Sequence, residues 1–131
     1  MGREKDVSTR LIRPTIPQFD TARILSFVER WDPNWEHDAS IKVTITKIFI
    51  FDEGIAQYML VDVESHYKFM AAIILSKPSL RCGIIDNEPD DILDSEGNII
   101  TLTKADNLSI EESKKIEHMK QILYNRGYRF K

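Results

Sequence analysis

Carboxylate side chains concentrate in the stretch "DNEPDDILDSE", residues 86–96. The acids in it are Asp86, Glu88, Asp90, Asp91, Asp94 and Glu96. Such a group of oxygens could bind a divalent cation, attract a basic partner, or stay solvated in a loop between two strands. The choice among these three chemistries decides most of what the sequence can indicate about function.

A calcium-binding loop is the most specific of the three, and its pattern is not met. The segment "DSEGN" looks like the middle of an EF-hand loop, but aligning Gly97 on the required glycine puts Ile92 and Thr103 at the first and last ligand positions. Neither residue can coordinate as that pattern requires. We therefore predict no metal and no cofactor. A looser divalent site stays open on one side of an extended segment, from Asp86, Glu88 and Asp90.

Two other interpretations of the acidic stretch remain. As a hairpin, "DSEGN" is ordinary turn chemistry, because Asp94 and Ser95 can bond to the backbone and Gly97 relieves strain. As a contact surface, the same acids make a concentrated negative field, which speeds encounter with a basic patch on another protein. Small proteins that inhibit nucleases or imitate DNA use this device. We predict that 86–96 is an acidic contact loop.

Aromatic and acid–base groups share the stretch "WDPNWEHD", residues 31–38. We predict that Trp35 and His37 bind the partner, since exposed tryptophan is enriched at binding hot spots. With Glu36 or Asp38 beside it, His37 could also do acid–base work, which makes this loop the first candidate for an active site. The structural interpretation has Trp31 in the core with Trp35 covering it, and His37 in water.

Both ends of the chain are basic, and the C-terminal end, "YNRGYRFK", interleaves cations with aromatics. Cations hold phosphates and aromatic rings stack on bases, so this pattern favours nucleic-acid binding. The candidate residues are Arg10, Arg13, Arg126, Tyr128, Arg129, Phe130 and Lys131. Alternatively, Arg126 compensates a helix dipole and the aromatics dock on a sheet. Whether the two basic ends meet on one face separates these alternatives.

Other chemistry-bearing residues carry weaker signals. Cys82 lies in a predicted strand, where a buried inert thiol is expected. Asp62, Glu64 and Lys68 faintly resemble a nuclease carboxylate–lysine cluster, but cross-hairpin pairs of this kind are common. The common phosphate-loop, nucleophile-elbow and metalloprotease motifs are absent from the sequence. We therefore predict no catalytic residue, with an enzyme of an unusual class near His37 as an alternative.

The bulk properties indicate a globular protein of one domain. The chain has 131 residues, a formal net charge of −3 and one cysteine, so no intrachain disulfide can form and a reducing compartment is favoured. The start carries no secretory signal, and the longest apolar run, residues 70–75, is far shorter than the ~20 residues of a membrane span. We predict a cytoplasmic protein with no membrane contact; the oligomeric state stays open.

The elements that would position these residues follow from periodicity and turn chemistry. We predict helices over 18–31 and 109–127, the second opened by a capping box of Ser109 and Glu112. We expect strands over 41–51, 55–64 and 67–75 as an antiparallel meander, with His66 at a turn, and a hairpin of 80–85 and 98–103. Residues 1–17 are expected to be a partly mobile arm before a single domain, 18–131.

The expected fold is therefore α+β. It has a single antiparallel sheet of about five strands, with the N-terminal and C-terminal helices packed on one face. The expected function is a small protein–protein interaction module of the inhibitor, immunity or accessory type. It would bind a partner with a basic surface through 86–96 and 31–38. The alternatives are a nucleic-acid-binding accessory protein that uses the basic ends, and the enzyme near His37.

Overall fold

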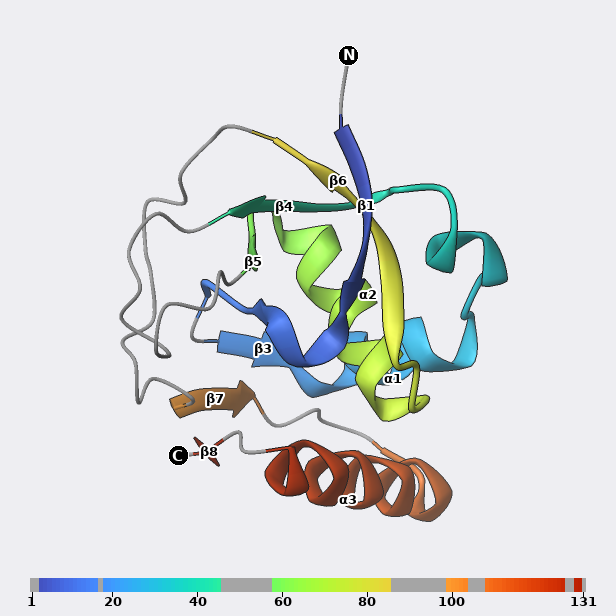
Figure 1. Ribbon diagram of the computed structural model, residues 1–131. Coiled ribbons are helices and arrows are strands. Elements are labelled where there is room, and N and C mark those ends of the chain that lie inside the picture. The colour runs from blue at the N-terminus through green and yellow to red at the C-terminus, as the bar shows by residue number, and fades with distance from the viewer. Residues whose placement is uncertain are drawn as a thin grey trace.

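The computed structural model describes residues 3–16, 18–45, 58–85, 99–103, 108–126 and 129–130, and of 99–103 and 129–130 only the backbone. The architecture is α+β, as expected (Figure 1). The helices are α1 (Thr21–Glu29), α2 (Val63–Ile74) and α3 (Ile110–Asn125), with short 3-10 turns η1 (Thr9–Leu11) and η2 (Pro33–Glu36).

The larger sheet runs in the order β1-β6-β4-β5-β2 and curls around α2 (Figure 1). Its strands are β1 (Arg3–Ser8), β2 (Ile12–Arg13), β4 (Ile41–Ile45), β5 (Tyr58–Leu60) and β6 (Ser79–Ile84). A smaller parallel sheet joins β3 (Gln18–Asp20), β7 (Ile99–Thr103) and β8 (Arg129–Phe130).

The expectation of a single antiparallel sheet was wrong in part, because the described strands form two sheets and the larger one is mixed. The expected hairpin of 80–85 and 98–103 was also wrong, since β6 and β7 lie in different sheets. β1 and β6 are antiparallel, as are β4 and β5, but β4 pairs with β6 in parallel and β2 with β5 in parallel. For β4 and β6 the cause is helix α2, which lies between β5 and β6 in the chain. A helical connection lets the chain cross to the far side of β4, where β6 enters parallel to it.

Helix α2 replaces the third strand of the expected meander, over 67–75. Asp62 opens the helix, since its carboxylate accepts the backbone N–H of Ser65 at 2.7 Å. Every residue from 65 to 74 is buried, including the polar Ser65, His66 and Lys68, so this part of the helix has no exposed polar face to mark a helical period in the sequence. His66, expected at a turn, therefore lies inside this helix, and the second expected strand ends at Leu60, the last residue of β5.

Both terminal helices are confirmed where local signals predicted them. Asp20 caps α1 by accepting the backbone N–H of Ala22 at 2.9 Å, and the Ser109–Glu112 capping box opens α3. The two helices contact each other and both contact α2, which lies between the larger sheet and α3 in Figure 1. The layer next to the sheet is thus α2 rather than the terminal helices.

The N-terminal segment contributes an edge strand to the larger sheet. β1 pairs with β6 from Arg3 opposite Ile84 to Ser8 opposite Ser79, and η1 and β2 follow directly. Val7 is buried opposite Leu80, which ties this strand to the core. Within the described residues, no helix is both long enough and apolar enough to cross a membrane.

Candidate functional site

One basic residue from each end of the chain, Arg10 and Arg126, lies at the same place in the fold. Arg126 is the C-cap residue of α3, and its Nη2 donates to the hydroxyl oxygen of Thr9 at 3.2 Å. Thr9 is buried in η1, and its hydroxyl is shared between the carbonyl oxygens of Lys77 at 3.1 Å and Pro78 at 3.2 Å. Arg10 follows Thr9 and is exposed. The structure therefore brings Arg10 and Arg126 together across the whole length of the chain.

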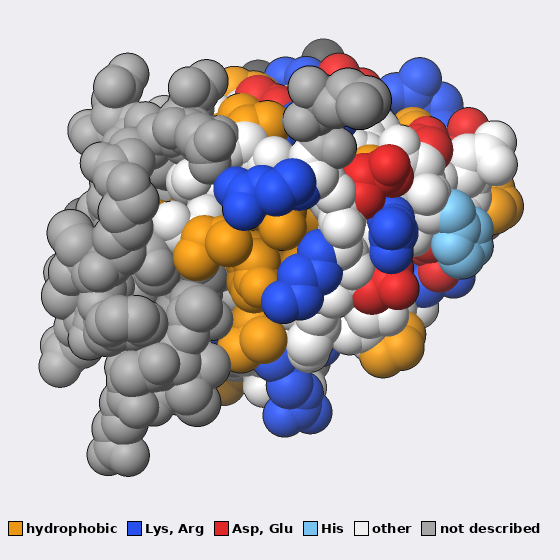
Figure 2. Space-filling model, turned by 45° about the horizontal axis from the view of Figure 1, so that its top comes forward, with side chains coloured by type: hydrophobic (Ala, Val, Ile, Leu, Met, Phe, Trp, Pro, Cys, Tyr) orange, Lys and Arg blue, Asp and Glu red, His pale blue; other side chains and the backbone are white. Residues whose placement is uncertain are grey.

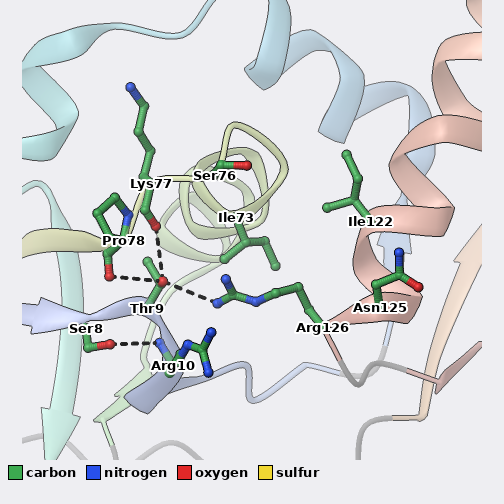
Figure 3. A pocket seen from close by; sticks show the side chains of 10 residues that line it. All are labelled: Ser8, Thr9, Arg10, Ile73, Ser76, Lys77, Pro78, Ile122, Asn125 and Arg126. Carbon is green, nitrogen blue, oxygen red and sulfur yellow. Dashed lines mark hydrogen bonds between the residues drawn. The ribbon is translucent and has the colours of Figure 1, made fainter.

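Between these two arginines lies a cavity of about 400 Å³ (Figure 3). Three segments build it: the end of β1 with η1, the end of α2 with the following turn, and the last turn of α3. Its lining residues are Ser8, Thr9, Arg10, Ile73, Ser76, Lys77, Pro78, Ile122, Asn125 and Arg126. None of these lining residues carries a carboxylate, so the charged groups around the cavity are all cations.

The turn after α2 shapes one wall of this cavity. The backbone N–H of Lys77 donates to the carbonyl of Ala72 at 2.9 Å, and Ser76 takes a positive φ of 60°. A helix often ends in this way, although a serine there is more strained than a glycine. The turn aims the Lys77 and Pro78 carbonyls at Thr9, which in turn holds Arg126.

Lys77 lines the cavity, but its ammonium group points away from the cavity and pairs with a carboxylate. Its Nζ forms an ion pair with Oε2 of Glu36 at 3.3 Å and lies 6.0 Å from the ring centre of Trp31. Figure 3 shows its side chain extending away from Thr9, whereas that of Arg126 reaches toward it. Among the described residues, no acid forms an ion pair with Arg10 or Arg126. Among the cavity's described cations, these two guanidinium groups are therefore the ones that no described carboxylate pairs with.

The aromatic loop 31–38 packs on the protein instead of standing free. Trp31 and Trp35 meet edge to face at 5.2 Å, and the ring of Trp35 lies 5.7 Å from that of Phe27. Both tryptophans are half-buried, while His37 is exposed. Glu36 pairs with Lys77, so the acid–base pair considered for His37 has no support in the described contacts.

The carboxylate–lysine cluster considered for a nuclease also takes another form. Asp62 caps α2, and Glu64 pairs with Lys68 at 3.3 Å one helical turn away. Lys68 is buried, donates to the hydroxyl of Ser40 at 3.1 Å and lies 5.0 Å from the ring centre of Trp35. Within the described part of the chain, no group of three His, Cys, Asp or Glu residues could hold a metal ion.

Several predicted site residues cannot be placed. The acidic loop 86–96, with Asp86, Glu88, Asp90, Asp91, Asp94 and Glu96, lies outside the described residues. So do Tyr128 and Lys131, and only the backbone of Arg129 and Phe130 is described. Arg13 is half-buried, and its Nη1 donates to the carbonyl of Arg10 at 2.9 Å, which places it behind the cavity rim and not among the lining residues.

Comparison with protein-family models, with curated proteins and with solved structures finds no match for this chain. No relative therefore supplies a role for a residue of the cavity.

A buried histidine that sequence reasoning placed at a turn joins the N-terminal segment to α2. The backbone N–H of Thr15 donates to Nε2 of His66 at 2.8 Å, so Nδ1 carries the proton and donates to the carbonyl of Asp62 at 2.6 Å. Burial lowers the pKa of His66 below its ordinary value of 6.5, opposed by the hydrogen bond to Asp62 and by the charge of that residue. The native fold therefore holds His66 neutral.

This arrangement predicts a loss of stability in mild acid. Because the unfolded chain binds the proton at a higher pH than the folded chain, the contribution of His66 is complete above pH 6.5 and is lost as the pH falls toward the lowered pKa. The slope should reach at most about 1.4 kcal/mol per pH unit for this one proton. Urea unfolding between neutral and mildly acidic pH measures it.

Two variants distinguish the contribution of His66 to the pH dependence of stability from that of the carboxylates, which titrate at lower pH. His66→Gln should flatten the slope, whereas His118→Gln, at an exposed position of α3, should leave it unchanged. An unchanged slope in His66→Gln would show that the histidine is not held neutral by the fold.

Proposed function

We propose that the chain is a small, non-enzymatic accessory protein that binds nucleic acid through the cavity where its basic ends meet. Arg10 and Arg126 would hold phosphate groups of the backbone. The bond from Arg126 to Thr9 is the observation that carries this proposal, because it joins residues 117 positions apart and puts both arginines on one cavity. Guanidinium groups suit phosphate, which accepts two parallel hydrogen bonds from them.

The local field supports the proposal more than the net charge does. The chain carries −3 overall, but phosphate contacts depend on the charges near them. Figure 2 shows how unevenly charge is spread on one face: Lys and Arg side chains border a hydrophobic strip, and most Asp and Glu side chains there lie to the right of it. A chain with sorted charges can therefore be acidic overall and still present a basic site.

Because two helix C-termini lie at the cavity, Arg10 and Arg126 determine the sign of the electrostatic field there. The C-terminal ends of α2 and α3 both lie at the cavity, and each contributes a partial negative charge of about half a unit. Arg10 and Arg126 outweigh these dipoles, while Lys77 is neutralised by Glu36. Removing both arginines should thus reverse the sign of the local field instead of merely weakening it.

The test measures binding of a fluorescent single-stranded DNA across a salt series by anisotropy. We expect the affinity of the native chain to fall steeply with salt. The double variant Arg10→Ala/Arg126→Ala should bind at least about tenfold more weakly at low salt, and its salt slope should fall by about 1.4 if each arginine contacts one phosphate.

Lys114→Ala is the matched control, since it removes one positive charge from the exposed start of α3, away from the cavity. It should change the affinity little. The single variant Arg10→Ala is included because the side chain of Arg10 is exposed, so its loss should leave the fold intact. Equal loss in Lys114→Ala and in Arg10→Ala would mean that binding follows total charge and not this cavity.

A protein partner is the second proposal, as expected for 86–96 and 31–38. The specific observation in its favour is Ile110, which is 77% exposed at the start of α3 beside half-buried Leu108. Leu108 and Ile110 line one hollow of the surface, and adjoining exposed apolar side chains, unlike single ones, mark contact surfaces. If the native chain retains no nucleic acid even at low salt, this second proposal takes the place of the first.

A further inference from the structure

We infer that the cavity between η1 and the ends of α2 and α3 takes one phosphorylated nucleotide unit. The phosphate would lie at Arg10 and Arg126 and the base against the apolar wall. The inference rests on the proposed function and deepens it, by naming what part of a nucleic acid enters. The same unit can come from a free mononucleotide or from the phosphorylated end of a strand.

The cationic half of the cavity is held ready for a phosphate. The buried hydroxyl of Thr9 accepts from Nη2 of Arg126, and two backbone carbonyls fix that hydroxyl. Within the described part of the chain, the bond to Thr9 is the one hydrogen bond of the Arg126 guanidinium, and no described group occupies its other N–H donors. Holding the cation in place before binding lowers the entropy lost when the ligand arrives.

The other half of the cavity is apolar, which a bare phosphate site would not need. Ile73, Pro78 and Ile122 supply hydrocarbon surface, and Figure 3 shows Ile73 and Ile122 on one side of Arg126 with Arg10 below it. Ile73 is only 1% exposed, so the hydrocarbon open to a ligand comes chiefly from half-buried Ile122 and exposed Pro78. A flat base can cover this wall while its phosphate reaches the arginines.

Size and polar groups fit the same ligand. A volume of about 400 Å³ lies within the range of small-molecule sites and exceeds what inorganic phosphate fills. Asn125 and Ser76 line the cavity and offer an amide and a hydroxyl to the sugar or the base edge. A mixture of apolar walls and few polar groups is what sites for organic ligands share.

The experiment titrates the full chain with adenosine 5′-monophosphate, adenosine and inorganic phosphate, followed by calorimetry and by amide shifts of Thr9, Arg10 and Arg126. We expect the nucleotide to bind about tenfold or more tightly than either half of it, because only the nucleotide uses both walls. Ile122→Ser should reduce the preference for nucleotide over phosphate. Gln121→Ala, at an exposed neighbouring position outside the lining, should not.

A second experiment compares one DNA strand with and without a 5′-phosphate. It distinguishes a phosphorylated strand end from a free mononucleotide as the ligand. Tighter binding of the phosphorylated strand, competed by the mononucleotide, identifies a strand end as the ligand. Tight binding of the mononucleotide with no difference between the strands identifies the free nucleotide.

Two outcomes would overturn the inference. One of them leaves the proposed nucleic-acid binding in place, and the other rejects it as well. Equal affinity for nucleotide and inorganic phosphate, with strands still bound through Arg10 and Arg126, rejects the nucleotide site and keeps nucleic-acid binding. No amide shift at Thr9 or Arg126 with any of the probes, and no retention of either strand, rejects both.

Discussion

Replacing Phe69 by alanine should lower the free energy of unfolding by about 3–5 kcal/mol, the range for truncating a buried aromatic. Phe69 has no exposed surface and lies in the middle of α2, between the larger sheet and the other helices. The loss combines the apolar area no longer buried with a cavity that the surrounding helices and strands cannot fill. Urea denaturation followed by circular dichroism measures it.

The same helix offers the control. Val63 opens α2 and is 47% exposed, so Val63→Ala should cost far less than Phe69→Ala. Similar losses in both variants would argue against the burial of α2.

The thiol of Cys82 in the native protein should react with iodoacetamide at least about a thousandfold more slowly than in the unfolded chain. Cys82 is fully buried in β6, as expected from the sequence, and its thiol lies 3.6 Å from the carbonyl of Leu80. Burial, with a smaller contribution from the charge of Asp6, raises the pKa of this thiol from 9.0 to about 12. Each unit reduces the reactive thiolate tenfold.

Mass spectrometry after timed labelling at mildly alkaline pH, with and without urea, gives both rates on the same chain. The unfolded chain is its own control, since it holds the same cysteine without the burial. Native labelling within tenfold of the unfolded rate would contradict the burial of Cys82 and would reopen the question of a reactive thiol. Slow labelling would leave Cys82 as a packing residue.

Local signals in the sequence were sufficient where an element depends on neighbouring residues. Asp20 and the Ser109–Glu112 box mark helix starts, and the apolar stripe of α3 buries Ile116, Met119 and Leu123 as its period requires. The same reasoning failed for α2, where complete burial removes the polar face that distinguishes a helix from a buried strand. The parallel pairing of β4 with β6 followed from the helix α2 that was predicted as a strand, and the parallel pairing of β2 with β5 from the N-terminal segment that was predicted as an arm.

By itself, the sequence determined the α+β class, a helix within each of the ranges 18–31 and 109–127, and the strand of Cys82, and it offered Arg10 and Arg126 among several candidate cations. Only the tertiary structure decided that these arginines share a cavity. The tertiary structure also shows that Thr9 and Ile73 line this cavity, that His66 is hydrogen-bonded to Thr15, and that Lys77 forms an ion pair with Glu36. Helix caps and hydrophobic periodicity depend on residues that are close in the chain, so the sequence shows them directly. A cavity forms where segments distant in the chain pack together, and that packing depends on all the elements of the fold.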